Sequence, residues 1–295
     1  MSSQLSPKQV ARALGVSESS LKRWCDQGLI QATKTSGGHR RLATESVLDY
    51  LRKSGQALAN PELLNLPVRA GNGPRTLERA QEDLLAAALA GDEACCQQIL
   101  LDLHVAGIPL SRVSDEVIAK VFRLIGEQWE CGETEVYCER RAVQACARAI
   151  YSLRQSLPPI ATTAPVAIGG TAACDPYTLP TNLVELVLRQ CGWVAHSLGS
   201  GLPFSTFARA IVDLRPRLFW LSVSHLECEA KFLDEYGAFY ETVSPRVCVV
   251  VGGRALHEEL RQQMKYGSYC DTLQHLEAFV GAAFPLRGKR RRGSN

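Results

Sequence analysis

The sequence predicts a multidomain protein: a winged helix-turn-helix domain, then a four-helix bundle, then an α/β flavodoxin-like parallel sheet. Three observations predict this order. Residues 1–55 are basic and carry closely spaced helical patterns, and residues 76–157 show apolar residues at helical spacing in four stretches. Residues 160–285 alternate short apolar runs with helical patterns, which is typical of the strands and helices of a doubly wound sheet.

Composition and length narrow the class of protein. A chain of 295 residues accommodates roughly two domains of ordinary size, and its apolar fraction of 46% excludes wholesale disorder. No apolar run approaches the ~20 residues of a membrane span, and the N-terminus lacks the apolar core of a secretory signal. Eleven cysteines without a signal or any CxxC pair indicate reduced thiols in a cytoplasmic protein that has no membrane partner.

The net charge of +3 hides an asymmetry along the chain. Residues 1–55 carry nine Lys and Arg against four Asp and Glu, and residues 287–295 carry five basic residues and no acidic one. The stretch between them is acidic. Positive charge at both ends of an otherwise acidic chain indicates that those ends bind a polyanion such as nucleic acid.

The first domain begins with two helices whose ends are recognisable. Ser6 followed by Pro7 is a good start for a helix, and Gly15 ends it. Ser17 caps a second helix over residues 17–26. A helix, a short turn and another helix form the helix-turn-helix motif.

A wing and a third helix complete this domain. Residues 33–41 are polar and predict a hairpin wing, with Gly37 and Gly38 allowing positive φ at its tip. Thr44 is predicted to cap a last helix over residues 45–53.

Candidate DNA-binding residues lie on the second helix and in the wing. Short hydroxyls and basic side chains on exposed helix faces suit phosphate and major-groove contacts. A Gly-Gly tip beside two adjacent arginines suits a phosphate clamp. On these grounds we expect DNA contacts from Ser19, Ser20, Lys22, Arg23, Lys34, Gly38, His39, Arg40 and Arg41.

Within residues 5–53, the runs LSPKQVARALGVSESSLKRWCDQGLI and TSGGHRRL resemble the winged DNA-binding domain of MerR-type transcription regulators. The resemblance implies binding to a two-fold, double-stranded operator as a dimer or larger oligomer. MerR-type proteins often dimerise through a long helix after the wing, and Pro61, Pro67 and Pro74 interrupt such a helix here. We therefore expect self-association through the C-terminal domains.

The spacing of apolar residues predicts the helices and strands of the rest of the chain. Four stripes predict the helices of an antiparallel bundle at residues 77–89, 99–105, 113–125 and 134–157. Buried strands are predicted at 165–170, 193–198, 218–224 and 247–251, and helices at 181–190, 204–214, 231–242, 256–265 and 272–280. The predicted division is a winged domain at 1–55, a linker at 56–75, a bundle at 76–158, an α/β domain at 159–286 and a basic tail at 287–295.

A four-helix cap in front of a flavodoxin-like sheet resembles cobalamin-binding modules. Joined to a MerR-type domain, it resembles the light-sensing, adenosylcobalamin-dependent repressors of the CarH and LitR type. In that family a Trp on the bundle is followed ten residues later by Glu-His. Here Trp129 is followed by Glu139 and then by Arg140, so the histidine that reaches cobalt after light is replaced.

The same modules carry Asp-x-His-x-x-Gly after the first strand, where the His is the lower cobalt ligand. Here the matching residues are Asp175, Tyr177 and Pro180. In the family, a Ser-x-Leu in the third strand and a Gly-Gly after the fourth line the tunnel for the nucleotide tail of cobalamin. By resemblance, the ligand pocket comprises Trp129, Glu139, Arg140, Asp175, Tyr177, Ser222, Ser224, Gly252 and Gly253.

Both histidine ligands of the family are therefore replaced. Arg140 has no lone pair to donate, and the neutral phenol of Tyr177 is a poor cobalt ligand. We expect no His-ligated cobalamin, which leaves three alternatives: no cofactor, another tetrapyrrole such as haem or a bilin, or weakly held cobalamin. Thiols that border the pocket by resemblance, and that could ligate haem iron or attach a linear tetrapyrrole, are Cys131, Cys138, Cys174 and Cys228.

These features predict a DNA-binding transcription regulator and not an enzyme, and they favour a repressor. Two alternatives stay open: a cobalamin-dependent light-sensing repressor, and a cobalamin-carrier module of a methyltransferase. The missing cobalt ligands disfavour both. An adaptor whose sheet domain binds only protein is a further class.

Overall fold

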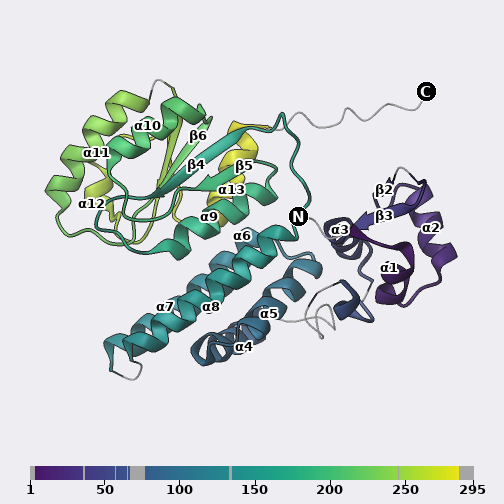
Figure 1. Cartoon of the computed structure of the whole chain (residues 1–295). Helices are drawn as coiled ribbons and strands as arrows, with labels where there is room; N and C mark the ends of the chain where they lie inside the picture. The colour runs from purple at the N-terminus through teal and green to yellow at the C-terminus, as the bar shows by residue number, and fades with distance from the viewer. Residues whose placement is uncertain are drawn as a thin grey trace. The chain divides into compact units, whose positions relative to one another are not determined.

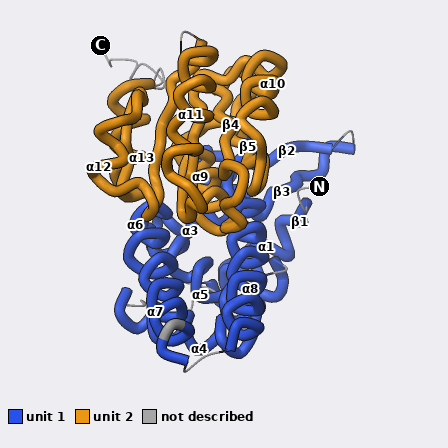
Figure 2. Tube along the Cα trace, turned by 90° about the vertical axis from the view of Figure 1, so that its left-hand side faces the viewer, with its two compact units in different colours: residues 1–159 blue, residues 160–295 orange. Residues whose placement is uncertain are grey.

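The computed structural model describes residues 4–35, 37–56, 58–64, 66, 77–132, 135–244 and 246–285. The chain divides into two compact units, residues 1–159 and 160–295 (Figure 2). Much of the predicted linker, including Pro67 and Pro74, and the predicted basic tail lie outside the described residues. Within the described ranges, no helix combines the length and the apolar composition that crossing a membrane requires.

The first unit begins with a small helical domain that carries an antiparallel sheet (Figure 1). Its elements are β1 (Gln4–Leu5), α1 (Pro7–Leu14), α2 (Glu18–Asp26), β2 (Ala32–Lys34), β3 (Arg40–Ala43) and α3 (Thr44–Ser54). Ser6 and Gln9 form a capping box at the start of α1, and Gly15, at φ +67°, ends it. The Ser17 side chain caps α2, and β2 and β3 form the wing. The predicted winged helix-turn-helix is confirmed.

One predicted cap is wrong. Thr44 is the first residue of α3, not its cap. Strand β3 runs directly into the helix, which leaves Ala43, the last strand residue, at the cap position without a capping side chain.

Residues 58–64, predicted as part of a linker, instead pack against α1. Leu58 and Leu64 are buried, and residues Pro61–Leu64 form the short 3₁₀ helix η1. The amide of Ala59 donates to the carbonyl of Ala13 at 2.9 Å. Two apolar side chains and a paired backbone therefore extend the winged domain beyond α3, because burying leucine on α1 is more favourable than exposing it.

The predicted four-helix bundle fills the rest of the first unit. Its helices are α4 (Leu77–Ala90), α5 (Glu93–Val105), α7 (Ala119–Glu130) and α8 (Val136–Gln155), and α6 (Leu110–Val113) continues through the π-helical turn η2 (Ser114–Ile118) into α7. The Ser114 hydroxyl donates to the carbonyl of Leu110 at 2.7 Å, a contact that distorts a helix locally. Buried side chains from all four helices form the core, among them Leu84, Ile99, Leu103, Val121, Ile125 and Ile150.

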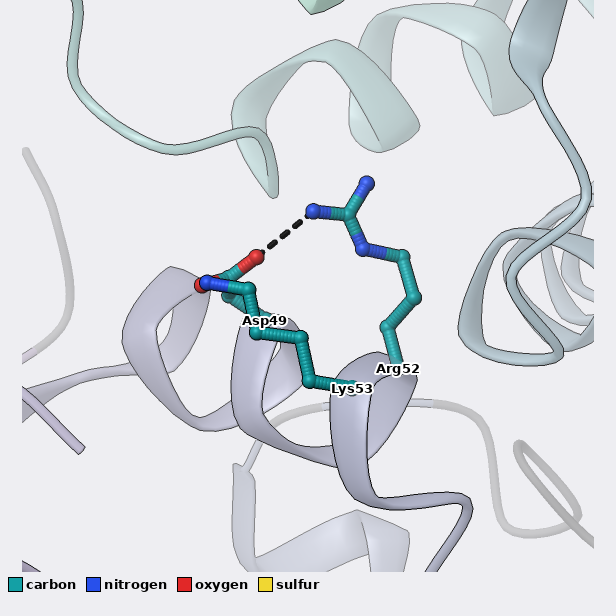
Figure 3. A network of polar contacts seen from close by, with 3 residues as sticks. All are labelled: Asp49, Arg52 and Lys53. Atoms are coloured by element: carbon teal, nitrogen blue, oxygen red, sulfur yellow. Dashed lines mark hydrogen bonds and ion pairs between the residues drawn. The ribbon is translucent and has the colours of Figure 1, made fainter. Parts of the chain in front are cut away.

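Helix α3 of the winged domain packs on α5 of the bundle. On α3, Asp49 accepts hydrogen bonds from Arg52 at 2.6 Å and from Lys53 at 2.5 Å (Figure 3). On α5, His104 is only 3% exposed, and its Nδ1 has no hydrogen-bond partner among the described residues. Burial and, to a smaller extent, the charge of Arg52 lower the pKa of His104 to about 4, against the opposing effect of Asp49.

This junction should make the first unit sensitive to acid. The folded-state pKa of His104 lies below its ordinary value of 6.5. The contribution of the neutral imidazole to the free energy of unfolding is therefore complete above about pH 6.5 and is lost as the pH falls toward 4. We expect a loss of about 3 kcal/mol over that window. Hydrogen exchange of the α5 amides between pH 7 and pH 4 measures it. His104→Gln, which cannot titrate, should flatten the profile; equal profiles for the two proteins would contradict the assignment.

The second unit is a parallel sheet in the order β5-β4-β6-β7-β8, as in flavodoxin-like folds. Its strands are β4 (Val166–Thr171), β5 (Val194–Ser197), β6 (Leu218–Ser222), β7 (Cys248–Gly252) and β8 (Ser268–Tyr269). Its helices are α9 (Thr178–Gln190), α10 (Phe204–Leu214), α11 (Glu229–Val243), α12 (Glu258–Arg261) and α13 (Leu273–Ala283). The predicted fold class and its four longer strands are confirmed.

The two faces of the sheet have different cores. Helices α10 and α11 cover an aromatic cluster that includes Phe207, Phe219 and Phe239. Helices α9 and α13 cover the opposite face, where Trp193 and Trp220 are buried. Strand β6 supplies both cores because successive side chains alternate between faces.

The predicted helix at 256–265 is mostly wrong. The ring of His257 caps the short helix α12 by accepting from the amide of Leu260, and the helix ends at Arg261. The Tyr236 hydroxyl then donates to the carbonyl of Lys265 at 2.6 Å, and the amide of Gly267 donates to the carbonyl of Val249 at 2.8 Å. These contacts turn the chain into β8, whose two residues are too few for an apolar pattern to reveal.

Candidate nucleic-acid interface and ligand pocket

The N-terminal turn of α2 carries a cluster of hydroxyls. The Ser17 side chain accepts the amide of Ser20 and lies 2.9 Å from the hydroxyls of both Ser19 and Ser20. One turn further along, Lys22 and Arg23 are exposed. The helix therefore presents polar hydrogens at its N-terminus and two cations beside them, which suits contact with a phosphate backbone and base edges.

The wing is a tight hairpin with an open backbone tip. The amide of Gly38 donates to the carbonyl of Thr35 at 2.9 Å, and the amide of His39 donates to the Thr35 hydroxyl at 3.2 Å. Gly38 has φ +78°, and nothing lies within 4 Å of the place where its Cβ would be. Lys34 and His39 are exposed on either side of this tip.

The two adjacent arginines of the wing have different surroundings. Arg40 donates to the carbonyl of Lys22 at 3.1 Å and to Asp26 Oδ1 at 2.5 Å, both on α2. The hydrogen bond to Asp26 raises the pKa of Arg40 above its ordinary value. Arg41 stands opposite Thr33 on the other face of the hairpin, where successive strand residues must point. Arg40 therefore joins the wing to α2, whereas Arg41 is half-buried on the opposite face of the hairpin.

The bundle residues of the predicted pocket lie on α7 and α8. Trp129, near the end of α7, is 46% exposed, which is high for an indole. On α8, Glu139 is half-buried and Arg140 is exposed. Within the described part of the chain, no group of three or more His, Cys, Asp or Glu side chains could hold a metal ion.

The carboxyl edge of the sheet brings other predicted residues together. Asp175 is 1% exposed, and its two oxygens accept the amides of Tyr177 at 3.1 Å and Ser224 at 2.6 Å. Burial raises the pKa of Asp175, and those amide hydrogen bonds oppose the rise. Asp175 therefore joins the loop after β4 to the loop after β6.

Arg254 also reaches this edge, and nothing in the sequence pattern singled it out. Its guanidinium lies 5.3 Å from the ring centroid of Tyr177, and its Nε donates to the carbonyl of Ser224 at 3.2 Å. The only signal that could have found it is its position directly after Gly252-Gly253 at a strand end.

Comparisons with known proteins match two segments of the first unit to known families. Residues 5–55 match the helix-turn-helix domain family, and residues 80–154 match the B12 binding domain family. The chain combines a helix-turn-helix domain with a B12 binding domain. It is 28% identical over 185 residues to the HTH-type transcriptional repressor CarH of Myxococcus xanthus, an alignment that covers 60% of this chain and 58% of that protein. The chain thus spans less than two thirds of this relative.

A solved structure supports the fold over most of the chain. The monomethylamine corrinoid protein of Methanosarcina barkeri superposes with a TM-score of 0.59 and 15% identity, covering 71% of this chain and 100% of that one. At that identity the likeness shows the fold alone.

The two wing arginines give the sharpest test of the DNA interface. Arg41→Ala should remove a phosphate contact and lower the slope of log K against log salt by about 1. Arg40→Ala should weaken binding by loosening the wing while leaving most of that slope, because Arg40 is already paired with Asp26. Fluorescence anisotropy of DNA binding across a salt series measures both. A slope loss for Arg40→Ala equal to that for Arg41→Ala would contradict the division of roles.

Proposed function

We propose that this chain is a DNA-binding transcription regulator that acts as a repressor, with the bundle and the sheet as its sensing part. The observation that carries the proposal is the contact of Arg40 with α2, which fixes helix and wing as one basic surface. The match to the helix-turn-helix family and the similarity to a repressor support it. Helix α2 would lie in the major groove, with the wing along the flanking phosphates.

Self-association is part of the proposal. One winged domain covers only a half-site, and specific operators usually need two. The segment after the wing folds back, with Pro61 and Leu64 buried, instead of extending as a helix toward a partner. The contact between chains would then come from residues beyond 77.

The sensing part is proposed to hold no His-ligated cobalamin. Tyr177 stands where the related modules carry the lower ligand, and its ring lies under Arg254. Arg140, at the other ligand position, offers no lone pair. A haem or bilin is the second candidate, favoured by this phenol–guanidinium pair, since tyrosine ligates haem iron in catalases. A cobalamin carrier for methyl transfer is supported by the likeness of fold alone.

Operator binding tests the regulatory function. We expect the full chain to select a two-fold sequence from random DNA and to bind it with at least two chains per site. Lys22→Ala and Arg23→Ala should each lower the salt slope by about 1, while Lys231→Ala, on α11, should not. Light scattering of the complex gives its stoichiometry. A one-to-one complex would count against self-association, and unselective binding against regulation.

Adenosylcobalamin tests the sensing part. Titration in the dark should give no His-ligated absorption spectrum, because neither Tyr177 nor Arg140 supplies an imidazole. Illumination should leave the oligomeric state unchanged. Micromolar binding with a His-ligated spectrum, or a light-driven change of oligomer, would overturn this part of the proposal and leave the DNA-binding part standing.

A further inference from the structure

Trp220 occupies the middle of the sheet on the α9 face. It lies in β6, between β4 and β7, and is 2% exposed. In the parallel register it stands directly opposite Gly169 of β4. A large aromatic residue in a central strand therefore faces the one residue type that has no side chain.

Gly169 provides the space that the indole uses. A Cβ at position 169 would lie 2.2 Å from Trp220 Cδ2 and 2.4 Å from its Cγ, far inside van der Waals contact. Glycine weakens the interior of a strand unless another group must approach closely. Here both the indole and the backbone carbonyl oxygen of Trp220, which also lies 2.2 Å from that Cβ position, make this approach, and the indole occupies the space beside Gly169.

The polar end of the indole is satisfied within the protein. Trp220 Nε1 donates to the Thr181 hydroxyl of α9 at 2.9 Å, and that hydroxyl lies 3.2 Å from the Ser197 hydroxyl at the end of β5. A buried indole N–H needs such a partner. Polar contacts between these three side chains therefore link β6, α9 and β5.

At the carboxyl end of β7, backbone atoms fill the space beside Gly252 and Gly253. A Cβ at Gly252 would lie 2.4 Å from the carbonyl oxygen of Cys270, and one at Gly253 would lie 2.2 Å from that of Val223. Ser222, at the end of β6, is buried on the same face as Trp220. The residues that would line a nucleotide tunnel thus contact one another and leave no room for a methyl group beside either glycine.

We propose that Trp220 permanently fills the internal slot in which a cobalamin-binding sheet would take the nucleotide tail. Its flat bicyclic indole has the shape of the benzimidazole base that ends this tail. The sheet domain therefore excludes tailed corrinoids for a reason separate from its missing histidine. This inference rests on the proposed sensing role, and it narrows any ligand of this domain to a tetrapyrrole without a nucleotide tail.

The test first restores a histidine at position 177 and then removes the indole at position 220. In the full chain, Tyr177→His alone should bind hydroxocobalamin poorly, and adding Trp220→Ala should raise that affinity at least about tenfold by equilibrium dialysis. Cobinamide, the same ring without a tail, should gain nothing from Trp220→Ala. Trp193→Ala in the Tyr177→His background is the matched control, because Trp193 is buried in the same core but precedes Val194, which pairs with Val166 at the other end of β4 from Gly169.

Three results would count against the proposal that Trp220 fills the slot. Tight hydroxocobalamin binding by Tyr177→His alone would overturn the proposal, as would a folded double variant with no gain or an equal gain from Trp193→Ala. Trp220→Leu replaces Trp220→Ala if the larger truncation unfolds the domain, and it should give a smaller gain of the same sign. Operator binding by every variant, measured in parallel, separates failure of this proposal from failure of the regulatory function.

Discussion

The sheet domain depends on the fit between one large side chain and one absent side chain. Trp220 can lie across β4 only because Gly169 stands opposite it in the parallel register. From that position its N–H holds Thr181, which positions the start of α9, and Thr181 in turn meets Ser197 at the end of β5. Three strands and a helix are thus joined through one indole, and the polar groups at the carboxyl edge are arranged on this packed base.

In the winged domain, the side chain of Arg40 joins separate elements in a similar way. Arg40 spans from β3 to the last turns of α2, where positive charge is favourable near the negative end of a helix. An exposed ion pair contributes little to the free energy of unfolding. Its effect is geometric: it sets the angle between wing and helix, and the pleat then turns Arg41 to the other face of the hairpin. Two adjacent arginines therefore have different surroundings.

Local signals predicted most of the fold. Ser6, Gly15 and Ser17 act on their own neighbours, and apolar runs of four to six residues reveal strands without knowledge of their partners. What could not be predicted depends on distant residues. The packing of residues 58–64 on α1, the end of α12 and the partners of Arg40 and Trp220 all require knowing which segments meet. For the candidate site, sequence reasoning found the residue types and missed Arg254, Thr181 and Gly169, which matter through their neighbours.

Asp175, which belongs to the candidate ligand motif, also has a structural task. Its carboxylate accepts the amides of Tyr177 and Ser224 and so ties two loops at the carboxyl edge of the sheet. Removing a buried acceptor would leave those amide donors unpaired, at a cost of about 1–3 kcal/mol each. This structural task requires no metal and no histidine two residues later. An Asp at this position is therefore weak support for cobalt chemistry, whereas the side chain at position 177 bears directly on it, and there the chain has a phenol beneath a guanidinium.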